Sequence, residues 1–573
     1  MTKKGLLPFA LGKEPCDLVI RGAKVANLFS MELEDVQVAV KDGVIVGVGS
    51  GYEGLETLDA EGMTLIPGMM DGHVHIESSW MIPSRFAEAV VPRGTSAVFA
   101  DPHEIANVLG PDGVIGMFES SRGLPLDVYL GCPSCVPASE FETCKVPMGP
   151  GELRSLRDGG YCQHLGEMMN YPGVLSGDQE VWDKIRVFDG MPLTAHAPGL
   201  TGKELCAYVL SGCDGDHEAT RLEEAMEKLR RGYWVMMREG SAAPDLEALA
   251  PLVRDVPLRC HRCMAVSDDL DARTLMEKGH MDHKVRKLCA LGVDPLVALR
   301  MVTLSVAEYF GLRGRGAIGP GFAADMALVD SIGSMKVHMV FKDGRLVARD
   351  GRLTTPPSSV LSPLLLSRGP DLPEVDVKAL AVPAKGGAML RAILFTPGSL
   401  LTGSVAVSPV VEDGFVVPSP EIDLAKLMCR ERHRGTGRIG VGFVKGLGLR
   451  SGAFGSTVSH DAHNAIVAGM DDRSIKTVLD RLNHLGGGVV VAEGDKILAE
   501  LPLPVGGLMC DMSTWEVVAL QERVDRAIGD LGVSGPHPCM ALSFLSLSVI
   551  PQLKLTDRGY VNLGEGGVLP LWV

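Results

Sequence analysis

Short runs in which apolar and polar residues alternate lie on both sides of a long central segment of the chain. Residues 36–46 and 340–347 each alternate in this way around a Lys-Asp-Gly sequence. Alternation with a period of two residues around Asp-Gly is typical of a β-hairpin. Because the two hairpins share one pattern, we predict a single small β-domain formed from residues 1–66 and 321–365.

The central segment alternates short apolar runs with stretches whose apolar residues are three and four positions apart. The second spacing is that of an amphipathic helix, as in residues 84–91 and 221–229. The apolar runs are Gly68–His75, Ser96–Ala100, Val128–Leu130, His164–Met168, Leu193–His196, Cys213–His217, Trp234–Met237 and Cys260–Val266. Strands and helices that alternate form parallel βα units, and eight units of this length close into a barrel. We therefore predict an α/β fold with a (β/α)8 TIM-like barrel over residues 67–320.

The last part of the chain has a different pattern. A stretch rich in Pro and Ser begins at Thr354 and continues to about Pro383, which indicates a connector. Strand-like and helical patterns are mixed beyond it, and residues 486–492 look like the start of a strand. We predict a C-terminal α+β domain over residues 380–573.

Composition narrows the class of partner. The apolar fraction of 46% and the charged fraction of 22% are those of an ordinary folded protein. A net charge of −16 disfavours nucleic acid and anionic membrane surfaces, so we expect a small-molecule substrate. The 13 cysteines are odd in number and scattered, and no apolar stretch of signal or membrane length is seen. We expect a cytoplasmic protein with free thiols that forms a homo-oligomer, a dimer or larger.

Side chains that can bind metal ions occur at the ends of five of the predicted barrel strands. They are His73, His75, Glu167, His196, His217 and Asp268. Catalytic groups in this fold come from the carboxyl ends of the strands. Because side chains two positions apart on a strand point the same way, His73 and His75 can face one ion. A single His at a strand end is usually structural, but the joint pattern predicts a metal centre.

The types of ligand indicate which ions would bind and what they would do. Neutral imidazole suits zinc, iron and manganese, and a carboxylate shared between ions favours a two-metal site. Glu167 is the natural bridge. Two ions about 3.5–4 Å apart lower the pKa of a shared water, which gives a bridging hydroxide as nucleophile near neutral pH. Asp268 is placed to accept the proton of this water and return it to a leaving group.

Longer strings give these residues a family context. The segment Pro67–His75, followed by the later Glu, His, His and Asp, resembles the metal-dependent amidohydrolase superfamily. Further strings resemble the prokaryotic adenine deaminases: His73–Ser79, Ala100–Gly110, Arg238–Ala243, Gly279–His283, Gly435–Gly446, Ser459–Asn464 and Leu501–Met509. One departure is Cys260-His-Arg-Cys263, which is not typical of that family. The resemblance covers nearly the whole chain.

This resemblance implies a reaction and a cofactor. The reaction would be the hydrolysis of adenine to hypoxanthine and ammonia. The ligand set would hold two divalent metal ions per subunit, Mn²⁺ or Fe²⁺ first and Zn²⁺ as a further candidate. All six predicted ligands match the family pattern.

Deamination of a purine also requires an acid that protonates the ring. Glu77 and Glu239 are the catalytic candidates, although Glu77 could equally be a carboxylate at a helix N-terminus. The substrate-binding candidates are Asp101, His103, Glu104, Arg238 and Ser241. The first three of these could instead orient metal-bound imidazoles.

Two other groups of residues have a functional and a structural interpretation. His280 and His283 lie three residues apart on a predicted helix, where they form either a solvated helix face or a site. Ser459–Asn464 concentrates polar side chains, which either help to close the barrel mouth or form a hydrogen-bonded turn.

Two alternative functions stay open. Another cyclic amide hydrolase, such as a dihydroorotase or hydantoinase, is the first. Members of that kind often bridge their metals with a modified lysine, whereas the fourth strand here offers Glu167 and no lysine. A catalytically inactive, metal-binding regulatory protein is the second, and the presence of Asp268 argues against it.

Overall fold

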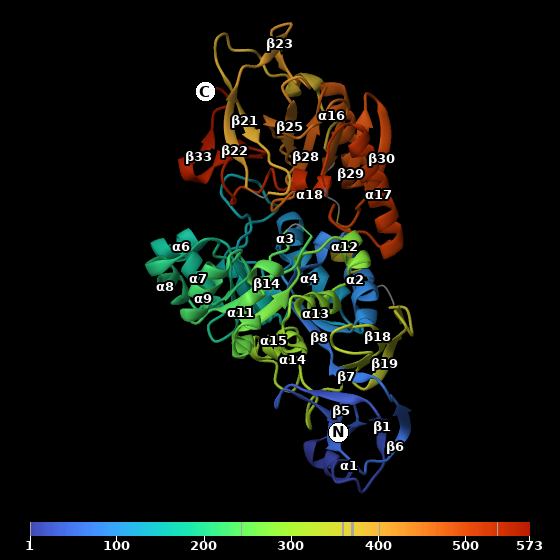
Figure 1. Cartoon of the computed structure of the whole chain (residues 1–573). Helices are drawn as coiled ribbons and strands as arrows, with labels where there is room; N and C mark the ends of the chain where they lie inside the picture. Colours follow the sequence, from blue (N-terminus) through green and yellow to red (C-terminus); the bar gives the residue numbers. More distant parts are fainter. Residues whose placement is uncertain (1, 242, 358–359, 368–371, 400, 536) are drawn as a thin grey trace.

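A computed structural model of the chain describes residues 2–241, 243–357, 360–367, 372–399, 401–535 and 537–573. Three parts follow one another along the long axis in Figure 1: small sheets near the N-terminus, a barrel in the middle, and a C-terminal domain at the other end. Among the described residues, we find no helix with the length and apolar character that a membrane span requires.

The middle part is a parallel barrel. Its strands are β8 (Met69–His75), β9 (Thr95–Ala100), β10 (Asp127–Cys132), β11 (His164–Met168), β12 (Leu193–Ala195), β13 (Gly215–Asp216), β14 (Trp234–Arg238) and β15 (Cys263–Val266). Each pairs in parallel with the next. β16 (Asp268–Asp269) then pairs with β8, where Asp268 lies opposite Val74, and this contact closes the ring. The predicted TIM-like barrel is confirmed.

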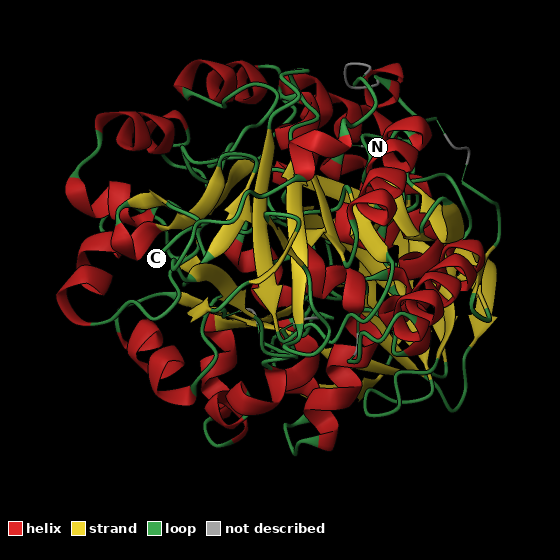
Figure 2. Cartoon of the chain, turned by 90° about the horizontal axis from the view of Figure 1, so that it is seen from above, coloured by secondary structure: helices red, strands yellow, loops and turns green. Residues whose placement is uncertain are grey.

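Helices surround the strands, as the view from above shows (Figure 2). They are α2 (Pro83–Val90), α3 (His103–Leu109), α4 (Pro111–Ser120), α5 (Pro150–Asp158), α6 (Tyr171–Ser176), α7 (Gln179–Val187), α8 (Gly202–Val209), α9 (Leu222–Arg230), α10 (Leu246–Leu249), α11 (Pro251–Arg254), α12 (Ala272–Glu277), α13 (Met281–Ala290), α14 (Pro295–Met301) and α15 (Leu304–Tyr309). α2 buries Phe86 and Val90, as its amphipathic pattern predicts. Residues 260–262, which we expected to begin the last strand, instead form a 3-10 helix that starts at Pro257. Proline favours the first position of a helix because its φ is already helical.

The small sheets join both flanks of the barrel segment. One contains β1 (Cys16–Arg21), β4 (Gln37–Lys41), β5 (Val44–Gly49) and β6 (Gly54–Asp59); the other contains β2 (Lys24–Asn27), β3 (Glu32–Asp35), β7 (Thr64–Pro67), β17 (Met326–Val329), β18 (Val337–Lys342), β19 (Arg345–Arg349) and β20 (Arg352–Leu353). β7 pairs with β17, so strands before and after the barrel share a sheet. Both predicted hairpins form, and their Asp and Gly residues have positive φ, as a tight hairpin turn requires.

The C-terminal domain contains a sheet with helices packed on it. Its strands are β21 (Leu390–Leu394), β22 (Gly403–Val407), β25 (Leu424–Arg430), β26 (Ile439–Lys445), β27 (Ala453–Ser456), β28 (Ala465–Gly469), β29 (Gly488–Glu493) and β30 (Lys496–Pro502). α16 (Asp472–Leu485) packs on this sheet, and α17 (Thr514–Asp530) and α18 (Pro538–Ser543) follow it. The expected strand near residue 488 is confirmed as β29.

Polar contacts hold the C-terminal domain against the carboxyl end of the barrel. The backbone N–H and the hydroxyl of Thr143, in the loop after β10, both donate to Asp557. Asn464 donates its side-chain amide to the carbonyl of Thr143. On the other side, His537 lies 2.7 Å from Asp271, which caps α12. The C-terminal domain therefore covers the end of the barrel at which the strands finish.

A buried cation ties two barrel strands together at that same end. Lys228, on α9, has a fully buried side chain whose Nζ lies 2.6 Å from Asp216 and 2.9 Å from Glu224. It also donates to the carbonyl of Ala197. Burial alone would lower the pKa of Lys228, but the two carboxylates raise it, so the group stays charged.

We expect Lys228→Met to destabilise the protein by about 3–5 kcal/mol, because the variant leaves two buried carboxylates without their cation. Chemical denaturation at neutral pH measures this change. Lys203→Met, at an exposed position on α8, is the control and should stay within about 0.5 kcal/mol of the parent. Equal stabilities of the two variants would contradict the role of Lys228.

Candidate metal centre

The carboxyl ends of four barrel strands bring several imidazoles together around the carboxylate of Glu167. His73 and His75, at the end of β8, have their ring centroids 4.9 Å apart, and the ring of His73 stacks on that of His217 at 4.1 Å. Glu167 lies on β11 between these groups. His196 follows β12 and His217 follows β13.

The carboxylate of Glu167 faces two pairs of imidazoles with its two oxygens. Its Oε1 lies 3.8 Å from Nε2 of His73 and 3.4 Å from Nε2 of His75. Its Oε2 lies 2.7 Å from Nδ1 of His196 and 3.4 Å from Nε2 of His217. The carboxylate is therefore shared between two groups of donors.

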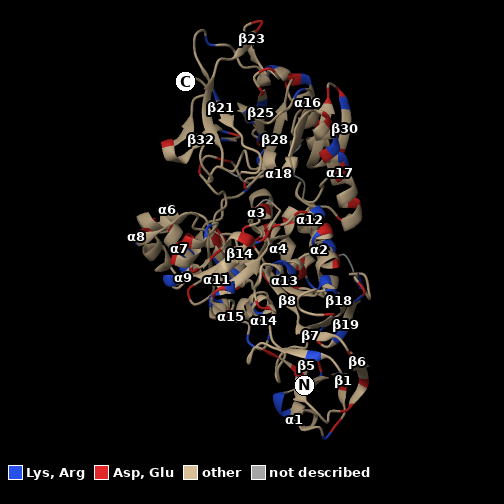
Figure 3. Cartoon of the chain, in the orientation of Figure 1, with Lys and Arg blue, Asp and Glu red and all other residues tan. Residues whose placement is uncertain are grey.

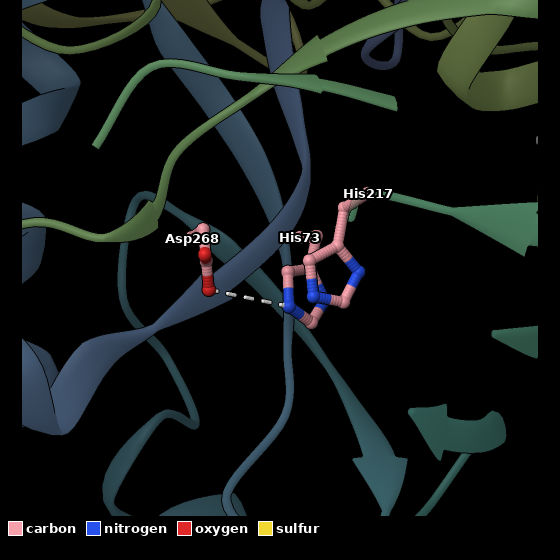
Figure 4. A group of neighbouring side chains, drawn as sticks. All are labelled: His73, His217 and Asp268. Atoms are coloured by element: carbon pink, nitrogen blue, oxygen red, sulfur yellow. Dashed lines mark ion pairs between the residues drawn. The ribbon is translucent and has the colours of Figure 1, made fainter. Parts of the chain in front are cut away.

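Asp268 approaches the same cluster from the strand that closes the barrel. Its Oδ1 lies 3.7 Å from Nε2 of His73 and 3.2 Å from Nε2 of His75. Figure 4 shows Asp268 opposite the stacked rings of His73 and His217. Asp268 has a φ of +61°, a conformation that costs free energy and is found mostly where surrounding contacts enforce it.

Neighbouring groups fix the orientation of the ligands. The N–H of His75 at Nδ1 donates to the carbonyl of Asp101 at 3.0 Å, which leaves Nε2 free to face the cluster. The side chain of Asp101 accepts the backbone N–H of Glu167 at 2.7 Å. Asp71 accepts the backbone N–H groups of His73 and Ser267. These acceptors join strands that meet at the rim.

The donor set fits divalent metal ions. Subsets of His73, His75, Glu167, His196, His217 and Asp268 have ligand atoms within 4.8 Å of one another, and all lie on the rim. Nε2 of His73, which faces the cluster, is buried and has no hydrogen-bond partner among the described residues. A buried polar atom left in this way is costly, and an ion would offset that cost. Imidazole with carboxylate is a donor set that suits zinc, iron and manganese.

The charges of the cluster also suit cations. Burial alone would raise the pKa of Glu167, but His196 and His217 lower it well below its usual range. Burial likewise opposes ionisation of Asp268, yet His73 and His75 hold its pKa well below the usual value. Both carboxylates are thus ionised at neutral pH. Burial lowers the pKa of His196, but Glu218 and Glu167 raise it to about 9, so metal binding there releases a proton.

A pocket opens above this cluster. Of the predicted substrate-binding residues, His103, Glu104 and Arg238 line it. Arg238 holds Oδ2 of Asp268 at 3.2 Å and also contacts Glu218. Glu218 lines the pocket too, 3.3 Å from Nε2 of His217.

Two of the predicted residues have other contacts. Glu239 binds Lys287 through both carboxylate oxygens and is not among the residues that line the pocket. The hydroxyl of Ser241 accepts the backbone N–H of Asp271, and its side chain does not line the pocket either. We correct both assignments, because neighbouring residues on an extended chain point to opposite sides and only Arg238 points inward.

Glu77 and Asp101 also lie behind the pocket wall. Burial, with Glu104 nearby, raises the pKa of Glu77 to about 8, and its Oε1 accepts the backbone N–H of Ile105. Asp101 supports His75 and Glu167 as described above. Neither is among the pocket-lining residues, so the expected contact of Asp101 with substrate gives way to an orienting role.

The remaining sequence motifs divide in two. Our interpretation of His280 as a solvated residue is wrong: its side chain is 0% exposed and its Nε2 lies 3.0 Å from Asp71. In the segment Ser459–Asn464, His460 and Asp461 line the pocket. This places the segment at the barrel mouth of its own chain.

Sequence reasoning missed several pocket residues. Glu218 directly follows the ligand His217, so its position was visible, but nothing in the spacing showed that it turns inward. Phe544, Leu547, Val549 and Ile550 form an apolar wall that comes from the C-terminal domain. No local signal marks such residues, because only the tertiary fold brings them to the barrel.

A parallel barrel whose strands end in this His, Glu and Asp cluster defines a metal-dependent hydrolase of the amidohydrolase class. The model of the amidohydrolase family matches residues 64–347, and that of the adenine deaminase C-terminal domain matches residues 399–566.

Relatives with full-length similarity identify the family within this class. "Adenine deaminase 2" of Carboxydothermus hydrogenoformans is 43% identical over 99% of both chains. The adenine deaminase of Oleidesulfovibrio alaskensis is 42% identical over 100% of this chain and 99% of its own, and that of Methanothrix thermoacetophila is 41% identical over 100% of both. The chain therefore belongs to the adenine deaminase family.

We expect Asp101→Ala to weaken metal binding by about 10–100-fold, because the variant removes the acceptor that orients the backbone of Glu167. Competition with a chelator of known affinity measures this change. Asp112→Ala, an exposed position on α4, is the control. Unchanged metal affinity in Asp101→Ala would show that Asp101 does not support the ligands.

Proposed function

We propose that this chain catalyses the hydrolytic deamination of adenine, in which adenine and water give hypoxanthine and ammonia. Membership of the adenine deaminase family over the whole chain supports this reaction. The observation that carries the proposal is the position of Glu167 between two pairs of imidazoles, with Asp268 facing the same centre. A carboxylate base beside a metal-binding cluster can activate water for the hydrolysis of a C–N bond.

The residues that would hold the metal are those at the rim. We propose two divalent ions per subunit, Mn²⁺ or Fe²⁺ first and Zn²⁺ as a further candidate. The ligands would be His73, His75, Glu167, His196, His217 and Asp268. Two such ions would lower the pKa of a water molecule and so would supply a nucleophile near neutral pH.

Asp268 is the group we propose for proton transfer. Its low pKa makes it a carboxylate at neutral pH. Arg238 donates a hydrogen bond to one of its oxygens, Oδ2. The other oxygen faces the cluster, where the attacking water would give up its proton. Asp268 then passes that proton to the departing amino nitrogen. The new C–O bond at C6 and the broken C–N bond account for hypoxanthine and ammonia.

The pocket supplies the remaining contacts with the base. Glu218 is the pocket-lining carboxylate beside His217 and Arg238, and we propose that it contacts the purine ring next to the reacting carbon. The apolar wall formed by residues 544–550 excludes water from the opposite side, which strengthens the electrostatic contacts within the site.

We also propose that the protein works in the cytoplasm as a homo-oligomer. Every cysteine lies among the described residues and is free, as in proteins of reducing compartments. Exposed apolar side chains such as Trp515, which is 73% exposed, offer surface for a subunit contact. Figure 3 shows Lys and Arg intermingled with Asp and Glu along the elements, so this view gives no support for a nucleic-acid surface.

We expect two metal ions per subunit after reconstitution of the metal-free protein, because Glu167 faces two separate pairs of imidazoles. Elemental analysis alongside ammonia release from adenine measures this directly. Glu167→Gln should hold fewer ions than the parent. A parent that binds at most one ion at full activity would argue against the two-ion site.

We expect Asp268→Asn to lower kcat for adenine by about 10²–10⁴-fold, since general acid–base catalysis contributes an amount of this size. Five other ligands remain, so the variant should keep its fold and much of its metal, which circular dichroism and elemental analysis would check. Asp189→Asn, at an exposed site, is the matched control. A kcat near that of the parent would remove Asp268 from the mechanism.

A further inference from the structure

The C-terminal domain contributes one carboxylate to the pocket. Asp461 lines the cavity together with His460 from the same turn, and with the apolar wall of residues 544–550. The ring of His460 stacks on that of Phe544, with centroids 5.0 Å apart. Polar and apolar groups of this domain therefore face the metal-binding rim across the space that a substrate would fill.

One oxygen of Asp461 has no partner among the described residues. The residue Asp461 is 4% exposed. Its Oδ1 lies 3.9 Å from Nε2 of His103 and 3.8 Å from Nδ1 of His460. Its Oδ2 is buried and has no hydrogen-bond donor among those residues. A buried carboxylate oxygen without a donor is costly, so a ligand that presents an N–H group would offset that cost.

The neighbouring carboxylate, Glu104, belongs to α3 of the barrel and not to the C-terminal domain. Its Oε1 lies 3.1 Å from the hydroxyl of Ser78 and 3.5 Å from Nδ1 of His460, while its Oε2 lies 3.8 Å from Nε2 of His463 and has no hydrogen-bond partner among the described residues. Nδ1 of His463 accepts the backbone N–H of Ser459, so the proton of the neutral ring is on Nε2. The N–H of His463 therefore faces Glu104 at a distance too long for a hydrogen bond. Asp461 is distinguished from Glu104 by its position, because it is the carboxylate that the C-terminal domain contributes to the pocket.

The arrangement of the pocket fixes which edge of a purine would meet Asp461. The reacting carbon, C6, must lie at the rim beside Glu167 and Asp268. His103 lies between the rim and the C-terminal domain, because its Nδ1 lies 3.6 Å from Glu167 and its Nε2 faces Asp461. In adenine the edge farthest from C6 carries N3 and N9, and N9 bears a hydrogen in the free base. That edge would point towards the C-terminal domain.

We propose that Asp461 accepts the N9–H of the free base and so makes the site selective for adenine over its nucleosides. This inference rests on the proposed deamination of adenine. A nucleoside has a sugar on N9, so it lacks the donor and would press against Val549 and Ile550. Sites built to hydrogen-bond a group strongly reject analogues that lack it, because the buried acceptor is then left unpaired.

Two variants test the contact by comparing adenine with adenosine. Asp461→Asn and Asp461→Ala should raise KM for adenine by about 10–100-fold with a smaller change in kcat, which is the size expected for a hydrogen bond to a charged group. The parent should discriminate against adenosine by at least about 10³-fold, and the variants by less. Metal content should not change. A KM that stays within about twofold of the parent in both variants would overturn the proposal.

Two analogues test it without depending on a variant. 7-Deazaadenine keeps the N9–H, whereas 9-deazaadenine has a C–H at that position and its hydrogen on N7. Calorimetry on the metal-loaded parent should show tighter binding of 7-deazaadenine, and Asp461→Asn should weaken that analogue alone. Equal binding of the two analogues by the parent would overturn the assignment of N9.

Asp557→Asn is the matched control. Asp557 is a buried carboxylate of the same domain that accepts two donors of Thr143, and it does not line the pocket. We expect a lower melting temperature with a KM within about threefold of the parent. The same rise in KM in both variants would show that the effect comes from loosened docking and would overturn the role of Asp461. A parent that releases no ammonia from adenine would instead remove the proposed function itself.

Discussion

The sharing of one carboxylate between two pairs of imidazoles is the interaction on which the rest of this site depends. Glu167 can face both pairs only if the strands β8, β11, β12 and β13 end at one level around the rim. Parallel pairing around a closed barrel provides this alignment, because every strand then runs in the same direction. The chemistry of the rim is therefore a direct consequence of barrel closure, and Asp268 lies on the strand that completes it.

A rim of this kind costs folding free energy, and contacts with the surrounding residues offset part of that cost. Several ionisable groups are buried within a few ångströms of one another, and each favours water over the protein interior unless it is paired. Lys228 neutralises Asp216 next to one ligand, and Asp101 accepts from the backbone of another. Stability and function are thus coupled here, since the contacts that hold the ligands in place also hold strands together.

Much of this was visible in the sequence. The spacing of His73 and His75 predicts two side chains on one face, and the ends of the apolar runs predict which other groups join them. The barrel followed from the alternation of runs and helices. Glu239 was misplaced because we ignored that Arg238 and its neighbour must point in opposite directions. His280 was misread because its buried partner, Asp71, lies far away in sequence, and only the fold brings the two together.

The division of the pocket between two domains has a consequence for how this protein can change. Groups that would break the C–N bond come from the barrel, whereas the wall over the bound molecule comes from residues 544–550 and the turn at Asp461. Substitutions in these residues of the C-terminal domain leave the strand ends of the barrel unchanged. The part of substrate preference that depends on these residues can therefore change during evolution without a change at the strand ends. A library of variants confined to these residues could be screened for activity on purine analogues while the catalytic residues of the barrel stay unchanged.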